Sequence, residues 1–363
     1  MTTWNQTRAT ALLGTEWPIV QGPFGGGYST VALAAAVSSA GGLGSFGAVG
    51  LSPAAIASTV DELRRATTRP FAINLWVPQS GEGVVTPEEF ERAVARLRPF
   101  YQQLGVVEPP LPERMTERFE EQAAAVLEAR PPVWSFIMGV PPAAMLEEAR
   151  RRGIVTIGTA ITVDEAVRLD ESGVDLIVAS GAEAGGHRGA FLRPAAESIV
   201  GTFALIPQVV DAVKAPVIAA GGIADGRGVV AALALGASAV QVGSAFLVAP
   251  ESAAPRAHKE LLGTPAARDT LLTRVYSGRL ARGIRNGLAR ALESAELEVP
   301  PYPVQSYLTQ PLRRAAAEAG DKEHLALWAG QSAAMVRAHP AADVLRLLVA
   351  EVGEVLGRWY KEK

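Results

Sequence analysis

An α/β fold of the (β/α)8 TIM-barrel class is predicted by two observations: eight short apolar segments alternate with helical segments, and glycine or polar residues gather where the apolar segments end. Parallel strands buried on both faces are apolar throughout, and (β/α)8 barrels place their sites at the carboxyl ends of such strands. An open doubly wound sheet has the same alternation and is the alternative fold. We also expect an inserted helical subdomain and a C-terminal helical extension.

The composition suits one large α/β domain with additions. The 363 residues are 48% hydrophobic and 20% charged, which is enough for a large core. A net charge of −3 favours neither nucleic acid nor an anionic membrane as a partner. The absence of cysteine excludes disulfides, thiolate metal sites and cysteine nucleophiles, and it is compatible with the reducing cytoplasm in which we expect the protein. The N-terminus has no basic segment followed by an apolar run, so no signal peptide is expected.

The first part of the barrel is expected in residues 1–78. Strands are predicted at 18–21, 43–46 and 71–77, and helices at 29–40 and after Ser52, a favourable N-cap that Pro53 follows. Residues 79–130 are charged, have a helical pattern and are too long for an ordinary connection. They are predicted to form the inserted helical subdomain.

The second part of the barrel is expected in residues 131–255, and a helical subdomain with a C-terminal helix in 256–363. The predicted strands are 133–138, 154–159, 175–180, 216–220 and 239–243, and they alternate with helices at 141–152, 162–172, 203–214 and 227–236. The uncharged stretch 229–249 is long enough to cross a membrane, but it divides into a helix, a glycine stop and a strand. We therefore expect no membrane span.

The segment GLGSFG at residues 42–47 matches the dinucleotide fingerprint G-x-G-x-x-G. That fingerprint requires a strand before it and a helix that opens at it. Here a predicted helix comes first and the glycines straddle a strand, so a dinucleotide site is the weaker hypothesis.

Polar and glycine residues lie at the carboxyl ends of the predicted strands, as the barrel fold requires. They are Gln21, Asn74, Thr159, Ser180 with His187, Gly221 with Gly222, and Gly243 with Ser244. In such barrels the loops after the last two strands often bind a phosphate through backbone N–H groups. We expect a cofactor or substrate that carries a phosphate there; the alternative is that these glycines only permit tight turns.

His187, in the loop GAEAGGHRG, is the candidate catalytic residue. It is one of four histidines, and it follows a buried strand, a glycine pair and a candidate phosphate face. An imidazole that titrates near neutrality can accept a proton from a carbon acid or stabilise an oxyanion, although many histidines are purely structural. Glu183 could act as a base, but we favour a role in which it holds the loop by accepting hydrogen bonds from backbone N–H groups. No metal site is expected.

The chain resembles the nitronate monooxygenases, which are FMN enzymes on a TIM barrel. The resemblance rests on QGPFGGG, AGGLGSFG, FAINLWVP, ASGAEAGGHRGAF, AAGGIADGRG, QVGSAFL and SGRLARGIRN, and PPYPVQSYLTQPLRR with LWAGQSAAM is similar to the class I branch. It implies oxidation of alkyl nitronates, and possibly of nitroalkanes, with O2 to carbonyl compounds and nitrite. Ile137 stands where class I members have a histidine, which puts the nitronate specificity in question.

The same resemblance implies the residues of the site. Those expected to bind FMN are Gln21, Gly22, Pro23 and Phe24 against the flavin ring, then Asn74, Ser180 and Gly185, and at the phosphate Gly221, Gly222, Gln241, Gly243 and Ser244. His187 matches the family's active-site histidine. Candidates for the substrate side are Arg279, Arg282, Arg285, Tyr302 and Tyr307, with surface or helix-capping roles as the alternative.

Two other functions remain open from the sequence. One is an NAD(P)H-dependent flavin reductase acting on enoyl-acyl carrier protein or quinones, because related flavin barrels carry out that reaction. The other is a flavin-binding protein without catalytic turnover. The expected partners are a small-molecule nitronate and O2, and the protein is expected to be a monomer or a homodimer.

Overall fold

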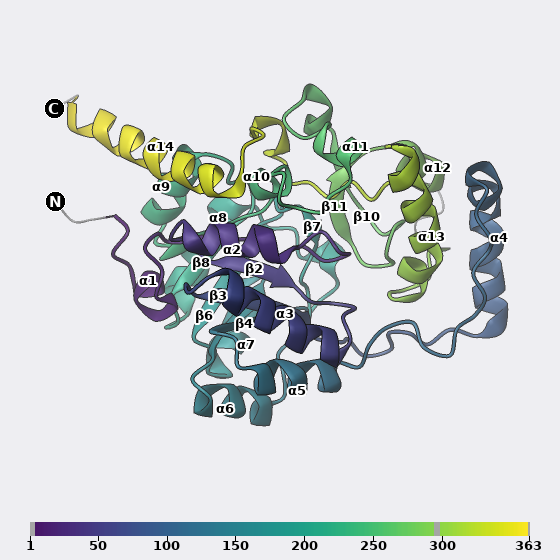
Figure 1. Cartoon of the computed structure of the whole chain (residues 1–363), viewed down its shortest axis with the longest axis horizontal. Coiled ribbons are helices and arrows are strands. Elements are labelled where there is room, and N and C mark those ends of the chain that lie inside the picture. Colours follow the sequence, from purple (N-terminus) through teal and green to yellow (C-terminus); the bar gives the residue numbers. More distant parts are fainter. Residues whose placement is uncertain (1–3, 294–297, 362–363) are drawn as a thin grey trace.

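The computed structural model describes residues 4–293 and 298–361, and its centre is a parallel β-barrel (Figure 1). In this part of the chain eight parallel strands follow the order β1-β9-β8-β6-β5-β4-β3-β2. They are β1 (Ile19–Gln21), β2 (Gly44–Gly47), β3 (Phe71–Trp76), β4 (Val133–Ile137), β5 (Val155–Ala160), β6 (Leu176–Ser180), β8 (Val217–Ala220) and β9 (Ala239–Val242). A parallel bridge between Val20 and Leu43 closes the barrel between β1 and β2. The predicted (β/α)8 fold is confirmed, and the open doubly wound sheet is excluded.

Helices cover the outside of the barrel in the order that the sequence predicts (Figure 1). They are α2 (Val31–Ser39), α3 (Pro53–Ala66), α5 (Phe119–Ala129), α6 (Ala143–Arg151), α7 (Val163–Glu171), α8 (Thr202–Ala212), α9 (Gly226–Ala234) and the short α10 (Ser244–Leu247). Ser52 caps α3 by accepting from the N–H of Ala55, and Asp225 caps α9. Both side chains satisfy N–H groups that the first helical turn leaves without a partner.

The amino-terminal end of the barrel is closed by α1 (Arg8–Leu13). Ala9 and Leu13 of this helix belong to the same buried apolar cluster as Val20, Ile157 and Ile218, which fill the barrel interior. The interior is therefore a packed core. Space for a functional site is therefore expected at the carboxyl ends of the strands.

The inserted segment 79–130 divides between two packing partners. The helix α4 (Pro87–Leu104) packs on α13 (Val304–Ala319), and the hydroxyl of Tyr101 donates to the carbonyl oxygen of Leu308 at 2.8 Å. The helix α5, in contrast, packs on α3 and contributes Val126 to the main core. The contacts thus make α5 the barrel helix between β3 and β4, although its pattern resembles that of α4. The predicted domain boundaries themselves stay a prediction.

A second, three-stranded sheet takes two strands from the C-terminal part of the chain, where the sequence predicted only helices, and one from the loop that carries His187. It has the order β10-β11-β7, with β7 (Gly186–His187), β10 (Thr270–Thr273) and β11 (Ala281–Ile284) paired antiparallel. Helices α11 (Arg256–Lys259) and α12 (Gly287–Leu292) accompany it. We call residues 256–339 together with α4 the cap. The short strands TLLT and ARGI carry no alternation of their own. They pair with each other, and ARGI also pairs with β7, so partners distant in the sequence decide their conformation.

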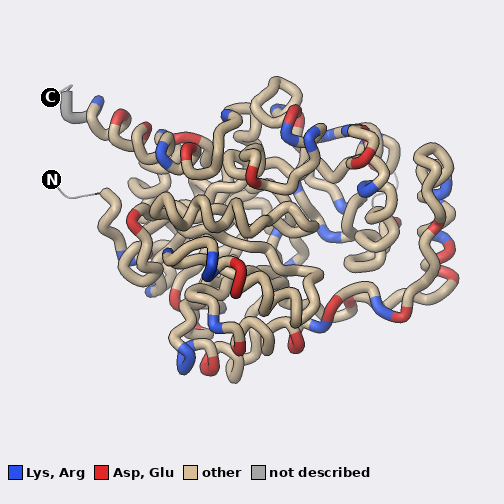
Figure 2. The backbone as a smooth tube through the Cα atoms, viewed as in Figure 1, with Lys and Arg blue, Asp and Glu red and all other residues tan. Residues whose placement is uncertain are grey.

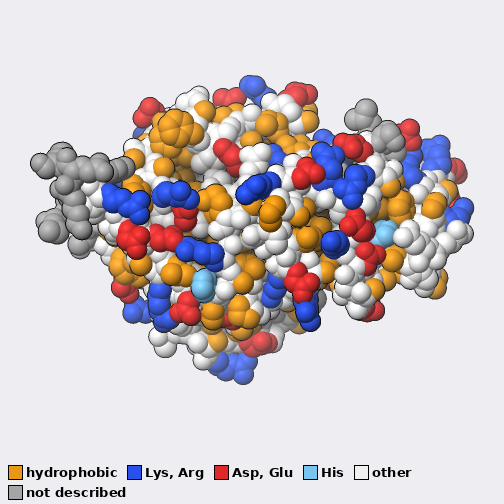
Figure 3. Space-filling view, turned by 90° about the horizontal axis from the view of Figure 1, so that it is seen from above, with side chains coloured by type: hydrophobic (Ala, Val, Ile, Leu, Met, Phe, Trp, Pro, Cys, Tyr) orange, Lys and Arg blue, Asp and Glu red, His pale blue; other side chains and the backbone are white. Residues whose placement is uncertain are grey.

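The helix α14 (Ala341–Lys361) packs on α9 and α2, and it runs past the edge of the barrel in Figure 1. Its residues Leu345, Leu348 and Val352 are buried. Acidic and basic residues are interspersed along the coloured part of the backbone tube in Figure 2, and their side chains are mixed over the face seen in Figure 3. None of the helices in the described ranges is long and apolar enough to cross a membrane, and the stretch 229–249 is divided among α9, β9 and α10.

Candidate active site

The turn after β8 has a backbone that glycine accommodates best. Gly221 and Gly222 have φ angles of +107° and +73°, and a Cβ atom on Gly221 would lie 2.7 Å from Thr202 Oγ1. Glu183 holds this turn, because its two carboxylate oxygens accept the Thr202 N–H at 2.9 and 2.8 Å, and the Thr202 hydroxyl lies 2.7 Å from Oε2. The predicted structural role of Glu183 is confirmed.

Backbone donors without a protein acceptor gather after β8 and β9. Within residues 4–293 and 298–361, the N–H groups of Gly222, Gly243 and Ser244 donate to no protein atom. A Cβ atom on Gly243 would have no atom within 4 Å, so the main chain borders open space. N–H groups without a protein acceptor at this end of the barrel suit a phosphate, whose oxygens accept hydrogen bonds. The residues present therefore fit the phosphate of the expected cofactor. We call residues 21–24, 221–222 and 243–244 the barrel rim.

The rim segment after β1 offers a different surface. Its amide donors are all used inside the protein: Gln21 N to Leu43 O at 2.9 Å, Gly22 N to Val242 O at 2.8 Å and Phe24 N to Ser29 Oγ at 3.0 Å. Pro23 has no N–H. The Gln21 side chain accepts from the N–H of Ser45 at 2.9 Å and joins β1 to β2. A flat ring placed here would meet carbonyl oxygens and apolar surface, not N–H groups.

The other residues expected to bind the cofactor lie around the same end of the barrel. Asn74 is buried and donates from Nδ2 to Ser135 Oγ at 3.0 Å. The carbonyl oxygen of Ser180 accepts from Arg188 at 3.1 Å, and Gln241 Cγ lies 3.8 Å from where a Cβ on Gly22 would be.

The loop 183–185 is joined to the rim through the cap. Gly185 packs on the backbone of Ala329 and Gly330, since its Cβ would be 2.5 Å from Gly330 N. The same Gly330 N–H donates to Ser244 Oγ at 3.1 Å, and Gln331 N–H donates to the carbonyl oxygen of Glu183 at 2.9 Å. The loop that carries His187 is thereby tied to the candidate phosphate site.

His187 is held between the barrel and the cap. Its strand β7 pairs with β11, and its Nε2 lies 2.8 Å from Ser277 Oγ. The ring contacts Trp76 at the end of β3, with centroids 4.7 Å apart, and Trp328 of the cap at 5.1 Å. Ser277 and Trp328 lie within two of the quoted motifs, SGRL and LWAG, but nothing in the sequence singled out either residue.

The charge state of His187 differs from the expectation. Burial, with additional effects from the positive charges of Arg279 and Arg313, lowers the pKa of His187 to about 3. The imidazole is therefore neutral at physiological pH. The sequence had suggested instead that it titrates near neutrality. A neutral ring among positive charges is a weak base, and the positive charges around it favour the binding of an anion.

Arg279 forms the wall beside His187. Its guanidinium lies 4.4 Å from the ring centroid of Tyr302 and 5.3 Å from that of Trp76, and its Nε donates to Glu82 at 2.6 Å. Arg279 and Tyr302 thus both contact Trp76, which contacts His187, and their role on the substrate side stays a prediction. Arg282 instead holds the backbone of the loop by donating to the carbonyl oxygen of Ala182 at 2.9 Å.

Two of the predicted substrate-side residues lie elsewhere. Arg285 pairs with Asp269 and Glu293, and the Tyr307 hydroxyl donates to the carbonyl oxygen of Pro110 at 2.9 Å. Their alternative, structural roles are the correct ones. Charge and position in the sequence gave no means of separating them from Arg279.

Ile137, at the end of β4, lies against Gly189, two residues after His187. A Cβ atom on Gly189 would be 2.7 Å from Ile137 Cγ1. The side chain is partly exposed, so the site has an apolar surface where a second imidazole was expected from the resemblance.

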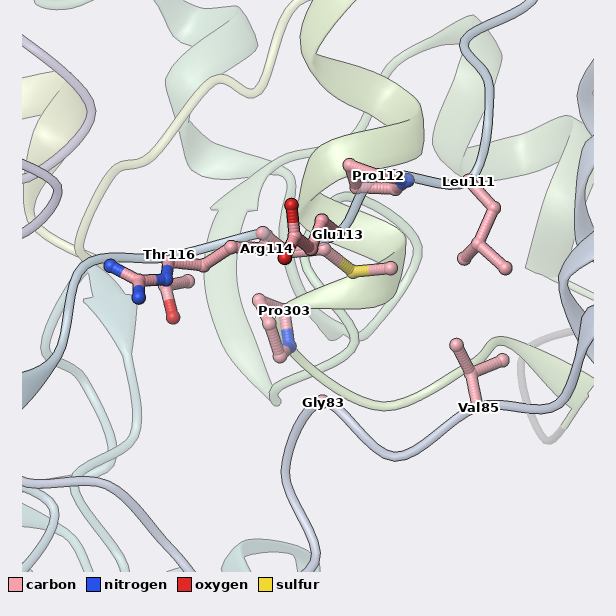
Figure 4. Close-up of a pocket in the computed structure, with 9 residues that line it drawn as sticks. Gly83, Val85, Leu111, Pro112, Glu113, Arg114, Thr116 and Pro303 are labelled. Carbon is pink, nitrogen blue, oxygen red and sulfur yellow. The ribbon is translucent and has the colours of Figure 1, made fainter.

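A separate hollow of about 350 Å³ lies between the inserted segment and the start of α13. Gly83, Val85 and the segment 111–116 line it, and Figure 4 shows Pro303 across from Pro112. It contains none of the residues expected to bind FMN. We therefore keep it apart from the site around His187.

The comparisons with known proteins agree with this geometry. The family model for nitronate monooxygenase matches residues 6–351. A probable nitronate monooxygenase of Staphylococcus aureus (strain JH9) is 38% identical over 354 residues, which cover 97% of this chain and 99% of the relative.

Two solved structures extend the similarity to the fold. Nitroalkane oxidase from Streptomyces ansochromogenes superposes with a TM-score of 0.89 at 36% identity, covering 97% of this chain and 100% of that chain. FabK from Thermotoga maritima gives 0.76 at 30% identity, covering 99% of each chain. Fold, site and relatives together make the protein an oxidoreductase, and the chain belongs to the nitronate monooxygenase family.

Proposed function

We propose that the protein is an FMN-dependent nitronate monooxygenase that converts alkyl nitronates and O2 to carbonyl compounds and nitrite. The observation that carries this proposal is the neutral His187 imidazole, enclosed beside cationic side chains at the same end of the barrel as the free N–H groups of the rim. This arrangement suits a phosphate-bearing cofactor and an anionic substrate. The family and the nitroalkane oxidase neighbour support it.

The rim residues would hold FMN. The N–H groups of Gly222, Gly243 and Ser244 would donate to its phosphate, and the segment 21–24 would lie against its ring. The cofactor supplies the electron acceptor and the site of reaction with O2. The protein supplies position, charge and exclusion of water.

His187 acts on the substrate through one ring nitrogen, because Ser277 fixes the other at 2.8 Å. Removing a proton from a neutral nitroalkane would create an imidazolium beside Arg279, which the lowered pKa of His187 opposes. A nitronate has already lost that proton and needs only a hydrogen bond and a positive field. We therefore expect nitronates to be better substrates than nitroalkanes. The apolar surface of Ile137 suits an alkyl chain.

Anaerobic mixing tests the proposal. The FMN-loaded protein is mixed with propyl-1-nitronate, with 1-nitropropane or with NAD(P)H, and bleaching of the flavin absorption is followed. We expect rapid bleaching by the nitronate only, with nitrite and propanal as products once O2 is admitted.

The structural similarity to FabK supports a second candidate function, that of an NAD(P)H-dependent flavin reductase. Bleaching by NAD(P)H and not by the nitronate would favour it and overturn the monooxygenase. Failure of every reductant would favour a flavin-binding protein without turnover.

A further inference from the structure

The segment 79–83, between β3 and α4, carries Glu82 to the loop that bears His187. Gln79 Nε2 donates to the carbonyl oxygen of Ala190, three residues after His187. The backbone N–H of Gln79 donates to Glu82 Oε2 at 3.1 Å, so the two residues fix the turn between them. The Glu82 carboxylate is therefore held at the carboxyl end of the barrel, beside the candidate site.

The carboxylate of Glu82 pairs with Arg279 of the cap. Arg279 Nε donates to Glu82 Oε1 at 2.6 Å, and Nη2 approaches the same oxygen. Nη1 donates to Met138 Sδ, and the ring centroid of Tyr302 lies 4.4 Å from the guanidinium carbon. The Arg279 and Glu82 side chains are only 9% and 15% exposed, so water screens their attraction less than that of a surface pair. All three guanidinium nitrogens are thus engaged by protein atoms.

Two sets of contacts join this ion pair to His187. The guanidinium carbon of Arg279 lies 5.3 Å from the ring centroid of Trp76, which is 4.7 Å from that of His187. On the backbone side, the Arg279 N–H donates at 3.3 Å to Ser277 Oγ, which lies 2.8 Å from His187 Nε2. An anion bound beside His187 would therefore lie in the electric field of both Arg279 and Glu82.

The partner of Arg279 differs in kind from those of the other arginines at this loop. Arg282 and Arg188 donate to backbone carbonyl oxygens of residues 180–182. They cannot change partners without releasing the loop. Arg279 instead pairs with a side-chain carboxylate, which another anion with two oxygens can replace while the backbone stays in place.

We propose that Glu82 competes with the substrate anion for Arg279 and thereby sets the affinity of the site for anions. The proposal rests on the proposed function and names a residue that determines its preference between anionic nitronates and neutral nitroalkanes. The Nε–Nη2 edge of a guanidinium matches two oxygens in one plane, which a nitronate presents as a carboxylate does. Glu82 occupies that edge, and its negative charge also repels an incoming anion.

Binding of a non-reacting anion tests this role. Sodium butyrate is a planar two-oxygen anion, and butyramide is its neutral counterpart. Calorimetric titration of the FMN-loaded protein compares Glu82→Gln with Glu88→Gln, which removes the same charge from an exposed position of α4. We expect butyrate to bind about 10-fold more tightly to Glu82→Gln, as for the removal of one like charge close to the anion, and unchanged to Glu88→Gln. Butyramide should bind equally to all three proteins.

Several results would overturn the proposal. Weaker binding of butyrate to Glu82→Gln would show that Glu82 positions Arg279 for the anion and does not compete with it. Unchanged binding, or no binding to either the wild type or Glu82→Gln, would show that Glu82 does not control anion affinity. An equal gain for butyramide would show that the effect is not one of charge.

A double variant tests whether the gain depends on Arg279. Glu82→Gln combined with Arg279→Met removes both charges, so neither partner is left as an unpaired buried ion. The tighter binding of butyrate seen in Glu82→Gln should be lost. If the gain persists without the guanidinium, Glu82 does not compete for Arg279.

Thermal melting and circular dichroism show whether each variant folds. Glu82→Gln leaves Arg279 without its carboxylate partner, so a modest fall in melting temperature is expected. If Glu82→Gln does not fold, Glu82→Ala takes its place in the titrations. Failure of both variants to fold would give the carboxylate a structural role and contradict the proposal.

The titrations do not depend on turnover, so the two proposals can fail separately. If the wild type oxidises no nitronate but Glu82→Gln binds butyrate more tightly, the proposed function is wrong and the role of Glu82 stands. If nitronates are oxidised and Glu82→Gln binds butyrate as the wild type does, the proposed function stands and the role of Glu82 is wrong.

Discussion

The barrel rim and the cap contribute to the site in different ways. The rim acts through main-chain groups, with glycines that let the backbone turn after β8 and with N–H groups at 222, 243 and 244 that have no protein acceptor. The cap acts through side chains from residues far apart in the sequence, namely Ser277, Arg279 and Trp328 around His187. The difference teaches that cofactor binding and substrate chemistry can be disrupted separately.

The largest effect is expected in the rim. Gly222→Asp places a carboxylate beside the free N–H groups and puts a side chain on a residue with φ of +73°, so the protein should lose its FMN. The measurement is the flavin-to-protein absorbance ratio after purification. Gly153→Asp is the control, because Gly153 has nearly the same φ, +71°, with no atom near its Cβ position. Unchanged flavin content in Gly222→Asp would show that this turn does not bind the FMN phosphate.

The next effect belongs to the cap side. His187→Asn should keep FMN but lower the turnover of propyl-1-nitronate about 10²- to 10³-fold, the range for one lost hydrogen-bond donor to a reacting anion. Flavin content and steady-state kinetics are measured together. His324→Asn, which alters a histidine paired with Asp321 away from the site, should retain activity. Full turnover in His187→Asn would take His187 out of the mechanism.

The cap should also govern the pH dependence of stability. Burial lowers the pKa of His258 to about 4 and that of His187 to about 3, both below the ordinary 6.5. The unfolded chain therefore binds more protons below pH 6.5, and each ring costs about 2 kcal/mol of stability between pH 7 and pH 5. Urea denaturation at the two pH values measures this loss.

Replacement of His258 tests whether its ring causes part of this loss of stability. His258→Gln retains an amide donor for the carbonyl oxygen of Trp328 without a titrating ring, so its loss of stability at pH 5 should be about 2 kcal/mol smaller. His339→Gln is the control with a less buried ring. Equal losses in the wild type and His258→Gln would contradict the prediction.

The smallest effect is expected at Ser277. Ser277→Ala removes the hydroxyl that fixes the His187 ring, so the maximal turnover should fall about 2- to 10-fold while FMN is retained, as for one neutral hydrogen bond. Ser277→Thr keeps a hydroxyl and should restore most of the activity. If the alanine and threonine variants are equally impaired, packing and not the hydrogen bond holds the ring.

The barrel elements were predictable because each is defined by its own residues. Every predicted strand ends within one residue of its position in the structure, since a short apolar run can be buried only as a strand between helices. Ser52 and Asp225 start their helices as expected, because capping is a local hydrogen bond. The roles of α5 and of strands β10 and β11 were not predictable, because packing partners distant in the sequence decide them.

The sequence by itself determined the barrel, the glycine turns after its last strands and the candidacy of His187, because each depends on neighbouring residues. Only the tertiary structure decided that His187 is neutral and that Arg279 is paired with Glu82. Charge state depends on burial and on charges brought together from distant segments. Neither the burial of a side chain nor its distance from charges in other segments can be read from the order of the residues.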